Sequence, residues 1–285
     1  MPITEEIRHR RFLGFGYFAP ELPPCFDSQE LARHRNSLMT ALRSPPPSKG
    51  QPAYQVFKSE KINFFHPRYR NTDRPHSIIN PISFFFISDC ICKNFGKLRH
   101  IERKSKISLS QSFFDSVGSR PIRRPAFPKR DSFISSVSTR FEFLAQTDIR
   151  AFYHSIYTHS IPWAIHGKDA AKKAPRDLSL IGNMLDLLTR NAQAGQTIGL
   201  PVGPDTSRVL AEVIAASIDA TATRYSKING KTGARFVDDY TFGCNSLEEG
   251  RKVIASVRRA AAKFELDIGR EKTRIEPTDH MAYVG

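Results

Sequence analysis

The sequence has 285 residues, of which 40% are hydrophobic and 25% are charged, a balance typical of a globular protein with a sizeable core. No apolar run approaches the length of a membrane span, which excludes an integral helical membrane protein. Lys and Arg outnumber Asp and Glu by 43 to 28, and this net charge of +15 favours a polyanionic partner such as nucleic acid.

The basic excess is concentrated in the first half of the chain. Residues 1–147 carry 24 Lys and Arg against 12 Asp and Glu, whereas residues 148–285 carry 19 against 16. We therefore expect the first half to hold phosphates and the second half to hold cations. Only Cys90 and Cys92 lie close together in sequence, so the four cysteines form no zinc-ligand pattern, and we expect all four to be reduced and buried. The N-terminus has no apolar signal-peptide core, which favours a cytoplasmic protein.

The first part of the chain is expected to form an N-terminal extension and a basic region. Residues 1–52 contain GFGYFAPELPPCF and end in a Pro-rich stretch, residues 44–52, which predicts an exposed loop. Residues 53–147 are basic and rich in Phe. Within them, RPHSIINPISFFFISDCICKNF predicts a short strand followed by a buried helix. A second basic cluster, RPIRRPAFPKR, occupies residues 120–130.

The pattern changes near residue 143, where FLAQTDI is an apolar run that ends in an acid, as in a buried strand. Helical spacing follows over about residues 178–194 and again over about residues 206–225, and the Gly/Pro loop GLPVGPD separates the two. ARFVDDYTFG then predicts two short strands joined at Asp238-Asp239.

The last segment is expected to contain a helix and a strand. Ser246 and Glu249 form a capping box, which predicts a helix from there to about Phe264, and ELDIGREKTRIEP predicts a turn and a strand. From residue 143 onward, the order is strand, helix, loop, helix, hairpin, helix and strand. This order predicts an α+β fold with helices on one face of an antiparallel sheet.

Three acids are candidates for chemistry: Asp148 at a strand end, and Asp238 and Asp239 at a hairpin tip. Carboxylates flanked by apolar strand residues are costly to bury unless they are paired or bind cations. Two neighbouring strands would bring Asp148 beside Asp238, and divalent metals would relieve the repulsion. Two Mg²⁺ ions about 3.5–4 Å apart support phosphoryl transfer. An Asp pair in a hairpin is by itself commonly a feature of the turn without catalytic function. The prediction of a catalytic site therefore depends on the occurrence of all three acids together.

This conjunction resembles the reverse-transcriptase family, whose four motifs occur here in family order. TDIRAFYHSI resembles motif A, GLPVGPDTSRVLAE motif B, FVDD motif C and FELDIGREKT motif D. The resemblance implies a right-hand polymerase fold, with residues 53–147 as basic fingers and residues 148–285 as the palm. It also implies that Asp148, Asp238 and Asp239 are catalytic. The metal ligands would be Asp148, Asp238 and the backbone carbonyl of Ile149.

The same resemblance implies contacts to substrate and to nucleic acid. Tyr153, five residues after Asp148, would pack under the sugar and exclude a 2′-hydroxyl, which implies a preference for dNTPs. Phe152 and Tyr153 would be neighbours on a strand, so we expect one of them in the core. The further nucleotide-binding residues implied are Arg74, Gly203, Pro204 and Lys272. The nucleic-acid-binding residues implied are Arg120, Arg123, Arg124 and Ser207, because an Arg fork suits phosphate oxygens.

Within the family, GYFAPELPPCF and FYHSIYTHSIPWAIHGK are similar to segments of the abortive-infection and unknown-group bacterial reverse transcriptases, which act in anti-phage defence. This implies a cytoplasmic bacterial protein. The chain departs from the usual family pattern at Val202 and Arg208 in motif B and at Gly269 in motif D, and it has no retron-type NAxxH segment. The sequence stops where a primer-grip hairpin would begin, so we expect the thumb to be absent or to lie beyond residue 285.

The expected function is RNA-directed, or template-independent, DNA synthesis in anti-phage defence. Nucleotidyl groups would pass from dNTPs to a primer 3′-hydroxyl, or to a protein or RNA primer, with two Mg²⁺ ions or with Mn²⁺ instead. The implied partners are an RNA template or non-coding RNA, the DNA product and dNTPs; the resemblance allows a homo-oligomer, and no membrane is expected. The alternatives are a retron or group II intron reverse transcriptase, and a catalytically weak palm that serves as a nucleic-acid-binding subunit.

Overall fold

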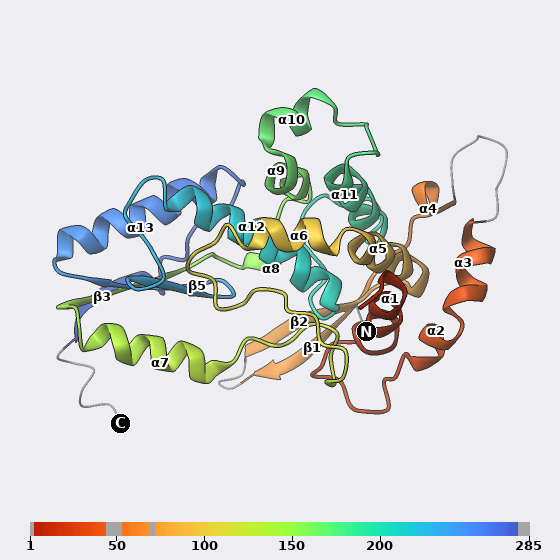
Figure 1. The fold of residues 1–285 in the computed structure, drawn as a ribbon, viewed down its shortest axis with the longest axis horizontal. Coiled ribbons are helices and arrows are strands. Elements are labelled where there is room, and N and C mark those ends of the chain that lie inside the picture. Colours follow the sequence, from red (N-terminus) through yellow and green to blue (C-terminus); the bar gives the residue numbers. More distant parts are fainter. Residues whose placement is uncertain (1–2, 44–52, 69–71, 279–285) are drawn as a thin grey trace. The chain divides into compact units, whose positions relative to one another are not determined.

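The computed structural model describes residues 3–43, 53–68 and 72–278 (Figure 1). The Pro-rich loop expected at residues 44–52 lies outside these ranges. The chain divides into two compact units, and each unit is built from three separate segments. The first unit comprises residues 1–98, 112–123 and 157–211. The second unit comprises residues 99–111, 124–156 and 212–285.

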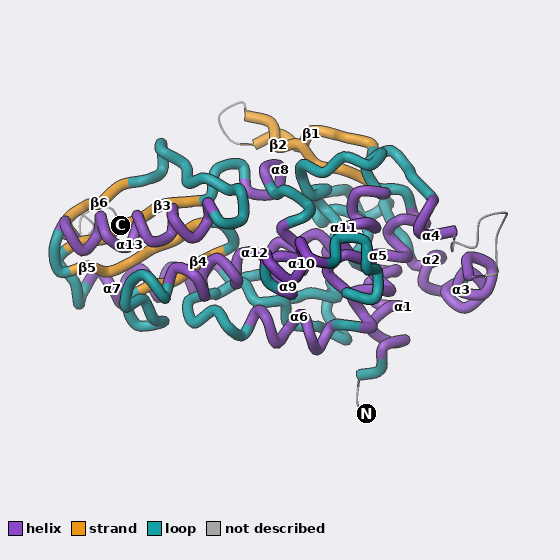
Figure 2. Tube along the Cα trace, turned by 90° about the horizontal axis from the view of Figure 1, so that it is seen from above, coloured by secondary structure: helices purple, strands orange, loops and turns teal. Residues whose placement is uncertain are grey.

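The first unit is mainly helical and includes a two-stranded hairpin, drawn in orange in Figure 2. Its elements are α1 (Glu5–Phe15), α2 (Gln29–Arg33), α3 (Arg35–Arg43), α4 (Ala53–Val56), β1 (Ile62–Arg68), β2 (Thr72–Ile78), α5 (Pro81–Lys93), α9 (Ser160–His166), α10 (Lys168–Lys173) and α11 (Ile181–Asn191). Helices α6 (Phe95–Glu102) and α12 (Asp205–Ala222) run through both units.

The predicted strand followed by a buried helix is confirmed as β2 and α5. Helix α5 begins at Asn80, whose side chain accepts a hydrogen bond from the Ile82 N–H, and Pro81 occupies the first helical position, where no N–H is needed. The Phe84 and Phe85 side chains are almost fully buried. Helix α5 packs against α1 and α11, so the run of phenylalanines forms the core of the first unit.

The second unit contains a four-stranded antiparallel sheet with strand order β4-β5-β3-β6. Its strands are β3 (Phe143–Asp148), β4 (Gly233–Phe236), β5 (Asp239–Cys244) and β6 (Arg274–Pro277). Its further helices are α7 (Phe127–Ser138), α8 (Phe152–Ser155) and α13 (Leu247–Ala262). The α+β fold with an antiparallel sheet is therefore confirmed. Strand β3 lies in the interior of this sheet, and the boundary expected between residues 147 and 148 cuts through its last pair of residues.

Helices cover both faces of the four-stranded sheet. Side chains alternate along a strand, so Arg235 and Phe236 of β4 point to opposite faces. The Arg235 guanidinium contacts α12, whereas the Phe236 ring lies 5.1 Å from the ring of Phe127 in α7. Figure 1 shows α13 and α7 on opposite sides of the strands. The expected layer of helices is thus formed by α12 and α13, and α7 adds a layer on the other face.

Helix α13 begins as the capping-box pattern predicts. The Ser246 hydroxyl accepts a hydrogen bond from the Glu249 N–H at 3.1 Å. The Glu249 carboxylate reaches one residue further back than the pattern predicts and accepts from the Asn245 N–H at 2.7 Å. Two N–H groups at the start of the helix are therefore satisfied by side chains.

Two expectations need correction. Phe152 and Tyr153 lie in the short helix α8 and not on a strand, because the chain turns at Ala151, whose φ is +45°. Phe152 is nevertheless the buried member of the pair, at 3% exposure. Cys25 is exposed and Cys90 is half-buried, whereas Cys92 and Cys244 are buried as expected. None of the described helices is both long enough and apolar enough to cross a membrane.

Candidate active site

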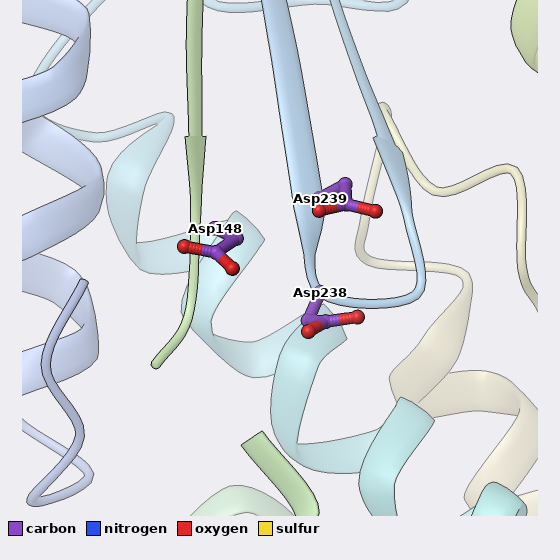
Figure 3. Close-up of side chains that lie close together, drawn as sticks. All are labelled: Asp148, Asp238 and Asp239. Carbon is purple, nitrogen blue, oxygen red and sulfur yellow. The ribbon is translucent and has the colours of Figure 1, made fainter. Parts of the chain in front are cut away.

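Three carboxylates meet at one end of the four-stranded sheet. Asp148 is the last residue of β3 and pairs in register with Asp239, the first residue of β5, and Asp238 occupies the β4–β5 turn. The Ile149 N–H donates to the Asp238 carbonyl at 3.2 Å, which ties the strand end to the turn. One carboxylate oxygen from each acid lies within 4.8 Å of the others, and Figure 3 shows the three side chains gathered there. The predicted convergence of the three acids is present in the structure.

These carboxylates are in a partly desolvated setting. The Asp148 side chain is 10% exposed, and that of Asp239 is 45% exposed. Burial, followed by repulsion from Asp239, raises the pKa of Asp238 to about 6. The three carboxylates therefore repel one another, and binding of a cation or a proton would relieve this repulsion.

Lys272 supplies one positive charge to this cluster. Its Nζ lies 2.8 Å from Asp148 Oδ2 and 3.3 Å from Asp239 Oδ1. Although partial burial opposes the effect, these carboxylates raise the pKa of Lys272 above its ordinary value. The lysine is held near the acids because the turn before β6 is tied to β3: the Gly269 N–H donates to the Asp148 carbonyl at 2.8 Å.

The donor set fits a divalent metal ion. Three carboxylates are hard oxygen ligands of the kind that Mg²⁺ and Mn²⁺ prefer. Asp148 Oδ1 is buried and has no hydrogen-bond partner among the described residues, so a cation would satisfy it. The expected role of the Ile149 carbonyl remains a prediction.

The backbone of the β4–β5 turn is held by two side chains that the sequence did not single out. Val237 has a φ of +61°, an unfavourable conformation for a β-branched residue. Its N–H donates to the Ser110 hydroxyl at 2.8 Å, and its carbonyl accepts from Arg235 Nη1 at 2.7 Å. Both backbone groups of the residue preceding Asp238 are thereby fixed.

Arg235 is itself anchored in a buried ionic network. Its side chain is fully buried and donates to Glu212 at 2.8 and 3.0 Å and to Asp219 at 2.9 and 3.0 Å. The Tyr240 hydroxyl donates to Asp219 at 2.9 Å. Although burial lowers it, the two carboxylates hold the pKa of Arg235 well above its ordinary value. In the sequence, this network was indicated only by the position of an arginine inside an apolar strand.

Gly269 lies where the chain passes directly against Asp148. A Cβ atom at this position would lie 2.1 Å from Asp148 Oδ1, which no real contact allows. The glycine that departs from the family pattern is therefore required by the close approach of the backbone to the carboxylate.

The remaining expected site residues fall into both units. Tyr153 belongs to the second unit, as do the three acids; it is half-buried, with its ring 5.7 Å from that of Phe152. Gly203 and Pro204 belong to the first unit, and Gly203 has a φ of +136°. Ser207, in the first turn region of α12, is 4% exposed and thus buried within the first unit.

The expected arginines differ in their surroundings. Arg120 contacts the Asp205 carboxylate at 3.0 Å and the Phe18 carbonyl at 2.7 Å, so its guanidinium is engaged in internal bonds of the first unit. Arg123 is exposed and pairs with Asp115 at 3.3 Å. Two others are exposed: Arg74 on β2 and Arg124 in the second unit.

Comparison with known proteins supports the same assignment. The sequence model of the family described as "Reverse transcriptase (RNA-dependent DNA polymerase)" matches residues 94–285. No curated protein matches the chain. Two solved structures of apo telomerase from Candida tropicalis, one truncated from its C-terminal domain, superpose with a TM-score of 0.51 at 10% sequence identity. The truncated one covers 85% of this chain, and the other covers 95%.

The chain spans about half the length of those telomerase structures, 54% and 52% respectively. At this identity, the likeness shows the fold alone, which is the fingers-and-palm fold expected from the sequence. The family match covers the β3 strand end, the α12 helix, the β4–β5 turn and the turn that carries Lys272. The chain therefore belongs to the reverse transcriptase (RNA-dependent DNA polymerase) family.

Proposed function

We propose that this chain is an RNA-directed DNA polymerase that transfers nucleotidyl groups from dNTPs to a primer 3′-hydroxyl. The observation that carries the proposal is the cluster of Asp148, Asp238 and Asp239, with one oxygen from each within 4.8 Å, on adjacent strands of a reverse-transcriptase palm. The buried Asp148 Oδ1, which has no hydrogen-bond partner among the described residues, adds to it. Burying carboxylates so close together costs free energy unless they bind a cation.

In this proposal, Asp148 and Asp238, with the Ile149 carbonyl, hold two Mg²⁺ ions, and Mn²⁺ would substitute. When bound, the ions would favour the deprotonated primer hydroxyl and stabilise charge on the leaving pyrophosphate. Asp239 adds negative charge beside them. Lys272 lies on an exposed turn and contacts Asp148 and Asp239. When a nucleotide binds, the ammonium group of Lys272 would leave these carboxylates and contact the triphosphate instead.

Nucleotide selection is assigned to Tyr153. It follows Asp148 by five residues, and its half-buried ring is supported from the side by the ring of Phe152. A rigid aromatic ring under the sugar would exclude a 2′-hydroxyl by steric contact. Gly203 and Arg74 are proposed to contact the nucleotide, and Arg123 and Arg124 the nucleic acid. Pro204 and Ser207 are weaker candidates for these contacts because both are buried. Arg120 is a weaker candidate because Asp205 and Phe18 already engage its guanidinium.

The biological role that we propose is anti-phage defence in bacteria. It rests on the segments GYFAPELPPCF and FYHSIYTHSIPWAIHGK, which are similar to those of the defence-associated branch. A non-coding RNA is the proposed template. Synthesis without a template, and priming on protein, are the alternatives within the same chemistry.

The proposal is tested by incubating the purified chain with a primed RNA template, Mg²⁺ and labelled dNTPs. We expect labelled DNA from the wild type and a loss of at least about 1,000-fold in Asp238→Ala. Asp131→Ala, which removes an exposed acid of α7, is the matched control and should retain activity. Product from Asp238→Ala at the wild-type rate would exclude the proposed site.

Two further arms of this assay define the reaction. Omission of single dNTPs changes product length if a template directs synthesis and not otherwise. Tyr153→Ala should incorporate ribonucleotides that the wild type rejects; unchanged selectivity would remove Tyr153 from this role. For the biological role, bacteria expressing the wild type should resist phage infection in plaque assays, and those expressing Asp238→Ala should not.

A further inference from the structure

The outward face of α13 carries a dense band of cations. Arg251, Lys252, Arg258, Arg259 and the C-cap residue Lys263 are all exposed, and we call these five residues the α13 basic face. The small side chains of alanines lie between them on the same face. The low net charge of residues 148–285 concealed this band, because acids elsewhere in that half offset it in the sum.

Most of these cations have no internal acidic partner. Lys252 pairs with Glu248 at 2.6 Å, and both side chains are highly exposed, so this pair is weak in water. Among the residues that the structure describes, no carboxylate oxygen lies within 4.0 Å of the guanidinium of Arg251, Arg258 or Arg259. Three arginines are therefore available to an external anion.

Two hollows flank the helix, and cations line each of them. One hollow, of about 660 Å³, is bordered by Tyr225, Lys227, Lys252 and Arg259. The other, of about 430 Å³, is bordered by Arg251, Arg258, Thr273 and Arg274. An extended polyanion that lay across α13 would thus contact positive charge in the first hollow, on the helix and in the second hollow.

The guanidinium of Arg259 is held in a defined place. It lies over the Tyr225 ring at 4.3 Å from the ring centroid, a cation–π geometry that orients the planar fork. Arg251 and Arg258 are seven residues apart, as are Lys252 and Arg259. At 1.5 Å per residue, each pair is separated by roughly 10 Å along the helix. Forked donors at regular intervals suit a chain of phosphates better than a single anion.

This face is remote from the carboxylate cluster. Asp148 and Asp239 are partners in register, so they share one face of the sheet, and Ala145 of β3 points to the other. Ala145 pairs with Ile275, whose side chain lies against Gly250 of α13. Helix α13 therefore covers the face opposite the acids, and the α13 basic face points away from them.

The composition of the face disfavours a lipid partner. A helix that lies in a membrane interface needs large apolar side chains beside its cations. The one large hydrophobic residue exposed on the described part of α13 is Leu247, at its first position.

We propose that the α13 basic face binds the phosphodiester backbone of a nucleic acid at a second site, separate from the carboxylates that act on the primer end. Binding here does not depend on polymerase activity. A segment of RNA or DNA bound at α13 would be retained while another segment is copied.

The test measures binding of the 285-residue chain to a fluorescein-labelled RNA hairpin, and to a DNA hairpin of the same sequence, by anisotropy at graded salt. The variant is Arg251→Ala/Arg258→Ala/Arg259→Ala. Its matched control is Lys172→Ala/Lys173→Ala/Arg176→Ala, which removes the same charge from exposed positions at and just after α10. We expect at least about tenfold weaker binding at 150 mM salt and a log–log salt slope smaller by about 2–3, with the control changed less than about threefold.

Several outcomes would overturn the proposal. Equal losses in both triple variants would show that net charge alone governs binding. If the Arg→Ala triple variant lost binding to phosphatidylserine vesicles and kept binding to the hairpins, the face would be a lipid site. The triple Arg→Lys variant keeps the charges and guards against misfolding; it should bind within about fivefold of the wild type, and complete loss in that variant, with an unchanged melting temperature, would contradict phosphate recognition.

Polymerase activity separates this proposal from the proposed function. The Arg→Ala triple should extend a short primer–template at the wild-type rate, because that substrate needs no contact with α13. A parallel loss of extension would place α13 on the primer path and exclude a second site. Loss of binding with extension intact would support it, and the difference between the RNA and DNA hairpins would show which nucleic acid is preferred.

Discussion

Gly269 illustrates how a single residue fixes the geometry of the acids. The backbone at this position runs so close to Asp148 that a Cβ atom would lie 2.1 Å from its carboxylate oxygen. Any side chain must displace either the carboxylate or the turn that carries Lys272. Since both groups belong to the candidate active site, a side chain at residue 269 should reduce activity more than it reduces stability.

We therefore predict that Gly269→Ala lowers the extension rate by about 100-fold, because a displacement near 1 Å at a reacting centre has this effect. Melting curves should show a loss of only about 1–3 kcal/mol in stability. Gly96→Ala is the control: no atom lies within 4 Å of the added Cβ in α6, and Ala favours a helix. Full activity in Gly269→Ala would show that Asp148 tolerates movement.

His9 is a second residue whose environment has a measurable consequence. Its ring is fully buried in the first unit, where Nδ1 accepts from Arg35 Nε at 3.1 Å. Nε2 then carries the proton and lies 3.1 Å from the Ser88 hydroxyl. Burial lowers the pKa of His9 to about 4, an effect that Asp89 opposes and Arg35 increases. The folded protein therefore holds His9 neutral.

Stability should consequently fall as the pH drops from about 6.5 to about 4. The unfolded chain takes up a proton at His9 near pH 6.5 and the folded chain only near pH 4, so the stabilisation present above pH 6.5 is lost across this interval, on the order of 3 kcal/mol. Urea unfolding at several pH values should show that the destabilisation by His9→Gln shrinks toward pH 4. A constant effect of His9→Gln across this pH range would contradict the assignment.

At the scale of elements, the β4–β5 hairpin places two acids by means of residues outside it. Ser110 comes from the segment after α6, and Arg235, which belongs to β4 itself, is anchored by Glu212 of α12. Together they hold Val237 in a left-handed conformation that a valine adopts only at a cost of roughly 1–2 kcal/mol. The direction of Asp238 thus depends on contacts that are distant in sequence.

Ser110→Ala should loosen this hairpin without unfolding the protein. The Val237 N–H would lose its acceptor at a cost of about 1–3 kcal/mol. We expect extension to fall by about tenfold or more and Mn²⁺ binding, followed by electron paramagnetic resonance, to weaken at temperatures where the protein is fully folded. In Ser256→Ala, the lost hydroxyl donates to the Lys252 carbonyl within α13, so Mn²⁺ binding should be unchanged. Equal Mn²⁺ affinity in both variants would exclude a positioning role for Ser110.

At the scale of the whole molecule, the chain order does not follow the compact units. The sheet that carries the acids needs β3, and its buried network needs Ser105, which donates to Asp219 at 2.6 Å, and Ser108, which donates to Glu212 at 2.6 Å. Both serines, and all of β3 except Asp148, lie before residue 148. The segment expected as the palm, residues 148–285, therefore lacks most of an interior strand of its own sheet and the serine partners of two buried carboxylates.

A fragment of residues 148–285 should accordingly fail to fold. Without β3, strand β5 loses its partner on one side and β6 loses the pairing that it makes among the described strands, so no continuous core forms. Circular dichroism should show no cooperative thermal transition for the fragment and a clear one for the full chain. A sharp transition in the fragment would show that the palm is independent of the preceding residues.

The sequence by itself determined the local elements and the three acids of the candidate active site. The strand before α5, the helices α11, α12 and α13, and the β4–β5 hairpin all follow from periodicity, turn residues and capping, which act within a few residues. Asp148, Asp238 and Asp239 could be named because a charged residue at the end of an apolar strand contradicts its surroundings. Their meeting followed from the pairing of two strands.

Tertiary structure alone decided the rest. The clamp on Val237, the need for glycine at Gly269 and the internal engagement of Arg120 depend on contacts between residues far apart in sequence, which local patterns do not encode. The α13 basic face was hidden for a related reason: charge summed along a chain includes acids that folding places on other surfaces. Because binding responds to the charges that share one surface, only the fold shows that the second half of this chain gathers exposed cations on one face of α13.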